Sequence, residues 1–147
     1  MIEVKVNRMP KWYMILAIVL LLWNLMGVGS FVQHIMISNS AEALAALPEE
    51  EATLYGKYPL WTHIAFAVSV IFGVLGCLGL LLKKKWSKPV FVISFVSIVI
   101  QMYHSLFIAK ATDVYGPGAV TMPILVILVG LFLIWMADYG IKKGFLH

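Results

Sequence analysis

Hydrophobic residues form four long blocks along the 147-residue chain, and short stretches between them hold most of the polar and charged residues. The blocks cover residues 12–33, 60–82, 89–109 and 119–139. At a rise of about 1.5 Å per residue, a helix of roughly 20 residues crosses the ~30 Å of hydrocarbon in a bilayer. The pattern therefore predicts an all-α integral membrane protein, a four-helix bundle that forms a single domain over residues 1–147.

Composition agrees with a membrane protein and narrows the possible functions. Hydrophobic residues make up 62% of the chain and charged residues 12%, and little sequence lies outside the four blocks. The first block is longer than the roughly 7–15 apolar residues of a secretory signal, so we expect it to stay as a true span. The single cysteine, Cys77, has no partner for a disulfide or a cysteine zinc cluster within one chain. We expect a non-enzymatic protein in contact with the lipid bilayer.

Basic residues are divided unequally between the two sides of the predicted bundle. One side, with both termini and the loop between the second and third spans, carries nine of them, and the other side carries two. The nine are Lys5, Arg8, Lys11, Lys83, Lys84, Lys85, Lys88, Lys142 and Lys143, and the two are Lys57 and Lys110. Because basic residues favour the inner side, both termini should be cytoplasmic, in a multi-pass protein of the cytoplasmic membrane. The net charge of +4 thus reflects orientation and gives no reason to expect nucleic-acid binding.

The loop between the first two spans contains signals for short helices. Asn39, followed three residues later by Glu42, has the pattern of an N-cap and its N3 residue. A second acidic turn is predicted from Glu49 to Tyr55, with Gly56 as its stop. Leucines give this loop an apolar side. We expect a short interfacial helix on the outer bilayer surface, with a lid folded over the bundle as the alternative.

The third span carries polar residues where lipid-facing residues are expected. The stretch QMYHSLFIAK contains Gln101, Tyr103 and His104 inside a hydrophobic block. At 100° per residue, five polar side chains fall within an arc of about 100°. They are Ser94, Ser97, Gln101, His104 and Ser105. Lipid offers no hydrogen-bond partners, so this stripe should face the interior of the bundle.

Other spans offer polar counterparts to this stripe, two of them histidines. An imidazole inside hydrocarbon needs a partner and changes its charge near neutral pH. We predict that His63 and His104, both in the outer half of the bilayer, approach each other in a polar cavity open to the outside. The full set of candidate ligand-binding residues is His104, Gln101, His63, Asn24, Tyr103 and His34. The chemistry of the small molecule that they would bind is not predicted.

These residues also have purely structural interpretations. Serine, asparagine and glutamine often join membrane helices or bond to their own backbone, and His34 could be a solvated residue at the membrane boundary. No two histidines stand at i,i+3 or i,i+4 on one helix, so their spacing predicts neither a metal site nor haem ligation. Motifs for nucleophilic catalysis or phosphate binding are likewise missing from the sequence. Asp138 is explained by an ion pair with Lys142, four residues on.

Two runs of the sequence carry a resemblance to a known group of proteins. They are YPLWTHIAFAVSVIFGVLGCLGLLLKKKW and QMYHSLFIAKA, in which aromatic, glycine and lysine residues punctuate hydrophobic helices. They resemble small bacterial four-span proteins similar in plan to the DoxX-like superfamily. The resemblance implies a four-span fold in a bacterial inner membrane. Some members are labelled sugar transporters, and DoxX-like proteins are implicated as partners of redox systems, but the resemblance assigns no catalytic residues.

Three functions are compatible with these features. The first is binding or transport through an outward-facing polar cavity, and the second is a structural or accessory subunit of a larger membrane complex. The third is a redox component that holds a quinone or haem. The inner half of the spans is nearly all apolar, which argues against a passage through one chain. We favour the binding function, and we expect the small residues Gly73, Gly76 and Gly79 to permit close packing of helices or of two copies.

Overall fold

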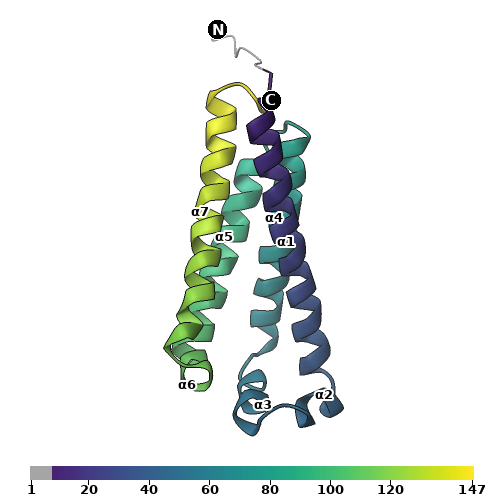
Figure 1. Cartoon of the computed structure of the whole chain (residues 1–147), viewed down its shortest axis with the longest axis vertical. Coiled ribbons are helices and arrows are strands. Elements are labelled where there is room, and N and C mark those ends of the chain that lie inside the picture. Colours follow the sequence, from purple (N-terminus) through teal and green to yellow (C-terminus); the bar gives the residue numbers. More distant parts are fainter. Residues whose placement is uncertain (1–7) are drawn as a thin grey trace.

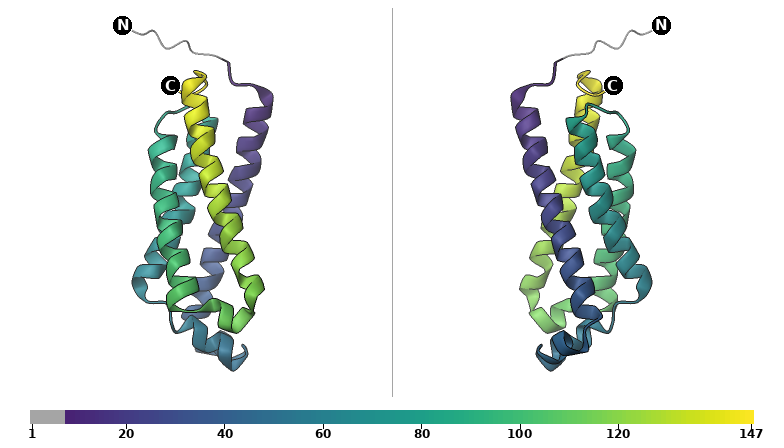
Figure 2. Two further views of the ribbon diagram at one scale, coloured as in Figure 1. Left: turned by 90° about the vertical axis from the view of Figure 1, so that its left-hand side faces the viewer. Right: turned by 90° about the vertical axis from the view of Figure 1, so that its right-hand side faces the viewer.

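The computed structural model describes residues 8–147 and confirms the all-helical membrane fold. Four segments of the described chain are long and apolar enough to cross a bilayer. They are Lys11–Ser38, Leu60–Leu81, Ser87–Ile108 and Pro117–Lys142. The segments lie side by side in an elongated bundle, and short helices cover one of its ends (Figures 1 and 2). Lys5, which contributes to the predicted orientation, lies outside the described residues.

The helices keep the order that the hydrophobic blocks predict. The long helices are α1 (Lys11–Ser38), α4 (Leu60–Leu81), α5 (Ser87–Tyr103), which continues as the π-helix η1 (His104–Ile108), and α7 (Thr121–Lys142). The short ones are α2 (Ala41–Ala45), α3 (Glu49–Tyr55), α6 (Ala111–Tyr115) and the 3-10 helix η2 (Pro117–Val120). We call the end formed by α2, α3 and α6 the loop end, and the opposite end, where α1 begins and α7 ends, the terminal end.

Helix α1 continues to Ser38 instead of stopping at residue 33, and this changes the assignment of Asn39. The side chain of Asn39 donates to Ile35 O at 2.9 Å and closes the end of α1. Ser40 is the N-cap of α2 in its place, since its Oγ accepts from Ala43 N at 3.1 Å. The predicted N-cap, Asn39, is therefore wrong by one residue. Asn39 and Ser40 are both of residue types that cap helices, and the structure uses Asn39 to end α1 and Ser40 to begin α2. Helix α3 runs over the predicted residues, with Gly56 after it.

Helices α4 and α5 form the centre of the packing, with α1 against α4 and α7 against α5. Glycines on α4 make this close approach possible. A Cβ atom on Gly73 would meet the side-chain oxygen of Asn24, and one on Gly76 would meet the ring of Phe91. Gly79 likewise lies against Ser87, where a Cβ would come within 3.0 Å. These glycines are buried inside one chain, so they do not form an exposed face for a second copy.

The terminal end is the best packed part of the bundle. Tyr13 is fully buried and donates a hydrogen bond from its hydroxyl to Met136 O at 2.6 Å, which joins α1 to α7. The C-terminal residues fold back on the same region, where Leu146 is fully buried and His147 N donates to Lys83 O at 2.8 Å. At the edge of this core, Asp138 pairs with Lys142 at 2.9 Å, as predicted, and the same carboxylate also pairs with a lysine of α5, Lys88, at 2.8 Å.

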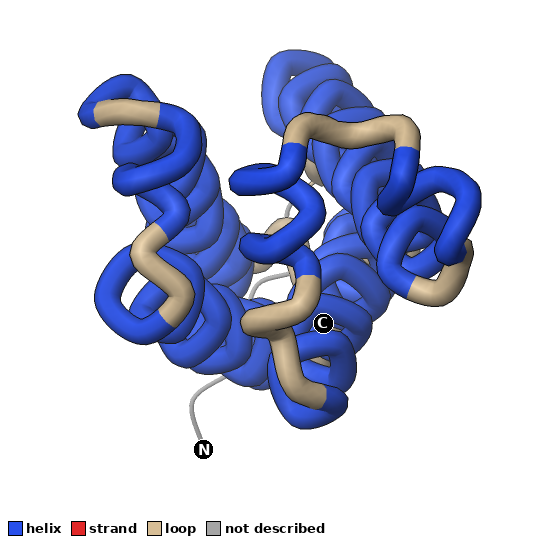
Figure 3. Tube along the Cα trace, turned by 90° about the horizontal axis from the view of Figure 1, so that it is seen from below, coloured by secondary structure: helices blue, strands red, loops and turns tan. Residues whose placement is uncertain are grey.

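At the loop end, α1 and α7 lie further apart than at the terminal end, and the loop after α1 folds over the bundle (Figure 1). Viewed from this end, α3 lies over the middle of the helices (Figure 3). Leu54 of α3 is 3% exposed and packs against Ala109 and Ala111. The hydroxyl of Tyr115 donates to Glu51 Oε1 at 2.9 Å and ties α6 to α3. Helix α3 therefore takes the lid arrangement that the sequence left as the alternative.

The arrangement makes the sidedness of the protein testable. The turn between α4 and α5 lies at the terminal end, together with the start of α1 and the end of α7 (Figures 1 and 2). Because this end carries most of the basic residues, we predict that it is cytoplasmic. In a Cys77→Ala background, a membrane-impermeant maleimide added to intact cells should label Glu50→Cys. It should label Lys85→Cys only after the membrane is opened. Labelling of Lys85→Cys in intact cells would contradict the orientation.

Candidate functional site

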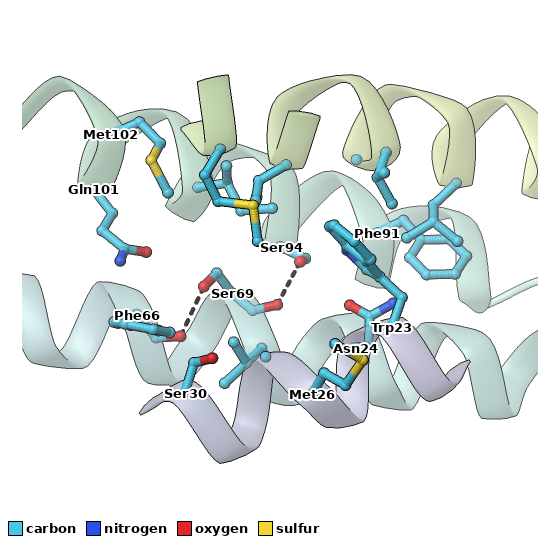
Figure 4. Close-up of a pocket in the computed structure, with 18 residues that line it drawn as sticks. Trp23, Asn24, Met26, Ser30, Phe66, Ser69, Phe91, Ser94, Gln101 and Met102 are labelled. Carbon is cyan, nitrogen blue, oxygen red and sulfur yellow. Dashed lines mark hydrogen bonds between the residues drawn. The ribbon is translucent and has the colours of Figure 1, made fainter. Parts of the chain in front are cut away.

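Two adjoining cavities lie between the spans, from the middle of the bundle toward the loop end. The larger has a volume of about 270 Å³ and lies among α1, α4, α5 and α7. The smaller, of about 180 Å³, lies nearer the loop end. Phe66, Gln101 and Met102 line both, so the two cavities adjoin along the bundle, and we call them together the hollow. Figure 4 shows the larger of them.

The larger cavity is mainly apolar and opens between α1 and α7. Its walls include Met26 of α1, Met122 and Val126 of α7, and Ile98 of α5. Met26 is 67% exposed and Met122 57%, which places them at the rim of an opening on the side of the bundle. That side faces the hydrocarbon when the four helices span a bilayer. A hydrophobic molecule could therefore enter from the lipid without crossing water.

Three polar side chains of this cavity, Ser94, Ser69 and Asn24, are already hydrogen-bonded within or between helices. Ser94 Oγ donates to Ser69 O at 2.6 Å and joins α5 to α4, and Ser69 Oγ donates to Phe66 O at 2.7 Å (Figure 4). Asn24 Nδ2 donates to Leu20 O at 2.8 Å and lies 3.5 Å from Cys77 Sγ. The predicted burial of Ser94 is confirmed, and its bond supports the structural interpretation. Asn24 lines the cavity, but its amide nitrogen is committed to α1 and α4.

Gln101 differs from these residues because its amide is unpaired. It is half-buried on α5, lines both cavities, and makes no hydrogen bond to the described residues. Its amide extends into the space between the helices (Figure 4). A glutamine amide offers two N–H donors and one carbonyl acceptor. Gln101 can therefore bind a small polar group in the hollow.

His34 lies at the centre of a cluster of aromatic rings. Its ring centroid is 5.1 Å from that of Tyr55, 5.3 Å from Tyr58, 5.2 Å from His63 and 5.9 Å from Phe66. Its side chain is half-buried and lines the smaller cavity. The alternative of a solvated boundary residue does not fit this position, because α3 and the residues after it cover His34.

His104 is buried against the same cluster without lining either cavity. Its exposed fraction is 2%, and its ring centroid lies 5.2 Å from Tyr58 and 5.1 Å from Trp61. Its Nδ1, like Nε2 of His63, is buried without a hydrogen-bond partner among the described residues. His63 contacts His34, so ring contacts connect the two predicted histidines through His34 and Tyr58. They belong to one cluster, but His34 is the one that faces the hollow.

His104 also begins the π-helix η1, in which Ala109 N donates to His104 O at 2.8 Å. A π-helical turn is rare and often accompanies a functional site. This turn carries Ser105 beside the smaller cavity, where its hydroxyl bonds to that of Tyr58 at 2.9 Å. The wider turn therefore helps to present a hydroxyl pair to the hollow.

Tyr103 does not belong to the site that we predicted for it. It is 59% exposed and lies 5.2 Å, ring to ring, from Phe107 on the outer surface of α5. On the helical wheel Tyr103 lies about 150° from the middle of the buried stripe, so its side chain points to the opposite side of the helix. Sequence reasoning also missed Tyr58, a wall of the smaller cavity, because an aromatic residue before a span indicates an interface anchor.

The lid is held by groups outside the membrane spans. Burial raises the pKa of the Tyr115 phenol, and the hydrogen bond to the Glu51 carboxylate raises that pKa further. Burial also raises the pKa of Tyr55, which stacks on His34. Both phenols therefore stay neutral near physiological pH. The hydroxyl of Tyr115 keeps its proton as the donor to Glu51, and this bond ties α6 to α3.

Among residues 8–147, no three His, Cys, Asp or Glu side chains gather to hold a metal ion. The chain matches no family model, no curated protein and no solved structure. The fold and the cavities define a small multi-pass membrane protein with a hollow inside its helix bundle.

Proposed function

We propose that this protein binds a single-chain amphipathic small molecule taken from the bilayer. The observation that carries the proposal is an apolar cavity that adjoins a smaller one lined by His34, with Gln101 lining both. Binding sites for small molecules are commonly apolar hollows with a few polar groups that fix the orientation of the ligand. The larger cavity suits an alkyl chain, and the smaller cavity suits its polar headgroup.

The packing of the bundle favours binding over transport. The hollow opens toward lipid between Met26 and Met122, whereas the terminal end is filled by a core that includes Tyr13, Met136 and Leu146. A ligand would enter from the side and leave the same way. Transport across the membrane would require this core to separate, and the described residues offer no polar path through it.

The proposal can be tested with a photoreactive ligand. Hexadecanol with a diazirine on its chain, added to the protein in phosphatidylcholine nanodiscs, should label α1 and α7 around the larger cavity. Ser30 lines this cavity, so Ser30→Trp should fill part of it and lower labelling at least fivefold, a loss of about 1 kcal/mol in binding. Val32→Trp, on the exposed side of α1 and outside both linings, is the control and should leave labelling unchanged.

Labelling confined to the outward surfaces of α4 and α5, or equal loss in both tryptophan variants, would contradict a binding site between α1 and α7. The peptides that carry the label can be identified by mass spectrometry in the unmodified protein. This measurement does not depend on the stability of either variant.

A second candidate function is that of an accessory subunit, with a partner's helix in place of the small molecule. The bonds of Ser94 and Asn24 support this alternative, because these polar side chains join helices of the bundle. A larger complex, or a homodimer that closes the opening between α1 and α7, would shield the cavity from the photoreactive alcohol.

The proposed setting is the cytoplasmic membrane of a bacterium, with the DoxX-like plan as the family hypothesis. Four helices long and apolar enough to span a membrane are compatible with this setting, and the family hypothesis rests on the resemblance of the sequence. Lys83 and Lys142, at the terminal end, support the orientation with this end inside.

A further inference from the structure

We infer that the headgroup of the bound molecule is uncharged and hydrogen-bonding, a hydroxyl or a carbonyl, and that Gln101 and His34 recognise it. This inference rests on the proposed function and specifies the class of ligand. It follows from three properties of the smaller cavity: its lack of charge, its unpaired polar groups and the packing of its aromatic rings.

No Asp, Glu, Lys or Arg lines either cavity. The two lysines of the loop end, Lys57 and Lys110, are exposed and belong to neither lining. A charged group that leaves water needs an opposite charge or several strong hydrogen bonds to offset its lost hydration. The described residues supply no such partner within the hollow, so a carboxylate, phosphate or ammonium headgroup would bind weakly.

The polar groups present are suited to a neutral partner. Gln101 has both donors and an acceptor without a bond to the described residues, and it lines both cavities. His34 makes ring contacts but no hydrogen bond to the described residues, and a neutral imidazole carries one donor and one acceptor. A hydroxyl can donate to one of these residues and accept from the other. A carbonyl can accept from both.

A cluster of aromatic rings could instead hold a cation against the ring faces. The rings around His34 are arranged differently, in contact with one another. Tyr55 stacks on His34 with an interplanar angle of 29°, and Tyr58 and His63 meet the same ring edge-on. The rings are packed against each other and do not enclose an open cage.

Competition among amphiphiles of one chain length tests the headgroup. The photoreactive hexadecanol is challenged in phosphatidylcholine nanodiscs with hexadecanol, hexadecane, palmitate or hexadecyltrimethylammonium, at equal mole fractions in the bilayer. Hexadecanol should compete about tenfold better than each of the other three, the factor expected from about one net hydrogen bond. The chain is the same in all four, so a difference reports the headgroup.

The role of Gln101 is tested by Gln101→Leu, which keeps the size of the side chain and removes its amide. It should reduce competition by hexadecanol about tenfold and leave competition by hexadecane unchanged. Gln33→Leu makes the same change at an exposed position of α1 outside both linings, and should have no effect. The midpoint of thermal unfolding, measured for both variants, shows whether folding is retained.

The outcomes separate the inference from the proposed function. Labelling at α1 and α7 with equal competition by palmitate or by the ammonium compound would overturn the neutral headgroup and leave the binding function in place. Equal competition by hexadecane would show that only the chain is recognised, and would also overturn the inference. Failure to label α1 or α7 in the unmodified protein would overturn the binding function itself.

Discussion

Replacing Tyr13 with alanine should lower the free energy of unfolding by about 4 kcal/mol, because removing a buried aromatic side chain leaves a cavity in a packed core. Tyr13 is fully buried, and its ring lies 5.4 Å from that of Phe145. Its hydroxyl makes a 2.6 Å bond to Met136 O, which joins α1 to α7 at the terminal end. The loss should therefore weaken the closed end of the bundle, opposite the lid. Unfolding by a denaturing detergent, followed by circular dichroism, measures the change.

Two further variants locate the cause of this effect. Tyr13→Phe removes only the hydroxyl and should cost about 1 kcal/mol, the net contribution of one hydrogen bond. Tyr103→Ala truncates a tyrosine that is 59% exposed on α5, and should change stability by less than about 0.5 kcal/mol. If Tyr13→Ala were no more harmful than Tyr103→Ala, the contact between α1 and α7 would contribute little to stability.

The fold could be predicted from the sequence because the bilayer leaves few alternatives. A segment in hydrocarbon must satisfy its backbone hydrogen bonds internally, so each long apolar block becomes a helix. The residues at which the helices end were less predictable. Gln33 and His34 interrupt the apolar pattern, yet α1 continues to Ser38, because the apolar residues that follow extend the same helix and Asn39 closes it. A polar residue within an apolar block therefore indicates what surrounds that position of the helix. It does not indicate where the helix ends.

The candidate site was only partly predictable. Helical periodicity predicted that Ser94 and His104 are buried, since both belong to one stripe of α5. It could not predict that α3 folds over the bundle and brings Tyr55 and Tyr58 onto His34. These contacts depend on the path of a loop, and a loop leaves no periodic signal in the sequence. The depth of His34 along its membrane span predicted a solvated position at the membrane boundary. Tertiary packing instead brings its side chain beside the smaller cavity.

The π-helix that begins at His104 has a similar explanation. No residue in the stretch from His104 to Ile108 requires a π turn by its own conformational preference. Ser105 lies in this wider turn and contacts Tyr58, a residue of the connection between α3 and α4. Such a feature arises from packing between distant segments, and hydrophobic periodicity carries no information about it.

The small residues of α4 lead to the second large effect that we expect. Gly76→Leu should lower the free energy of unfolding by about 3 kcal/mol, near the upper end for overpacking of a core. A Cβ at this position would already overlap the ring of Phe91, with Cζ only 2.8 Å away. Helices α4 and α5 would have to separate at the most extensive contact in the bundle. Gly29→Leu is the matched control, because a Cβ on Gly29 meets nothing within 4 Å and the residue is exposed on α1.

A double-mutant cycle with Phe91→Ala tests whether the ring is the obstacle. Phe91→Ala alone should cost about 3–4 kcal/mol through the cavity that it leaves. In the double variant the new leucine occupies part of that space, so the total loss should be at least 1 kcal/mol smaller than the sum of the two single losses. Additive losses would mean that Gly76 is needed for some contact other than Phe91.

Phe91 also lines the larger cavity, so displacement of its ring by Gly76→Leu should reduce labelling by the photoreactive alcohol while Gly29→Leu leaves labelling unchanged.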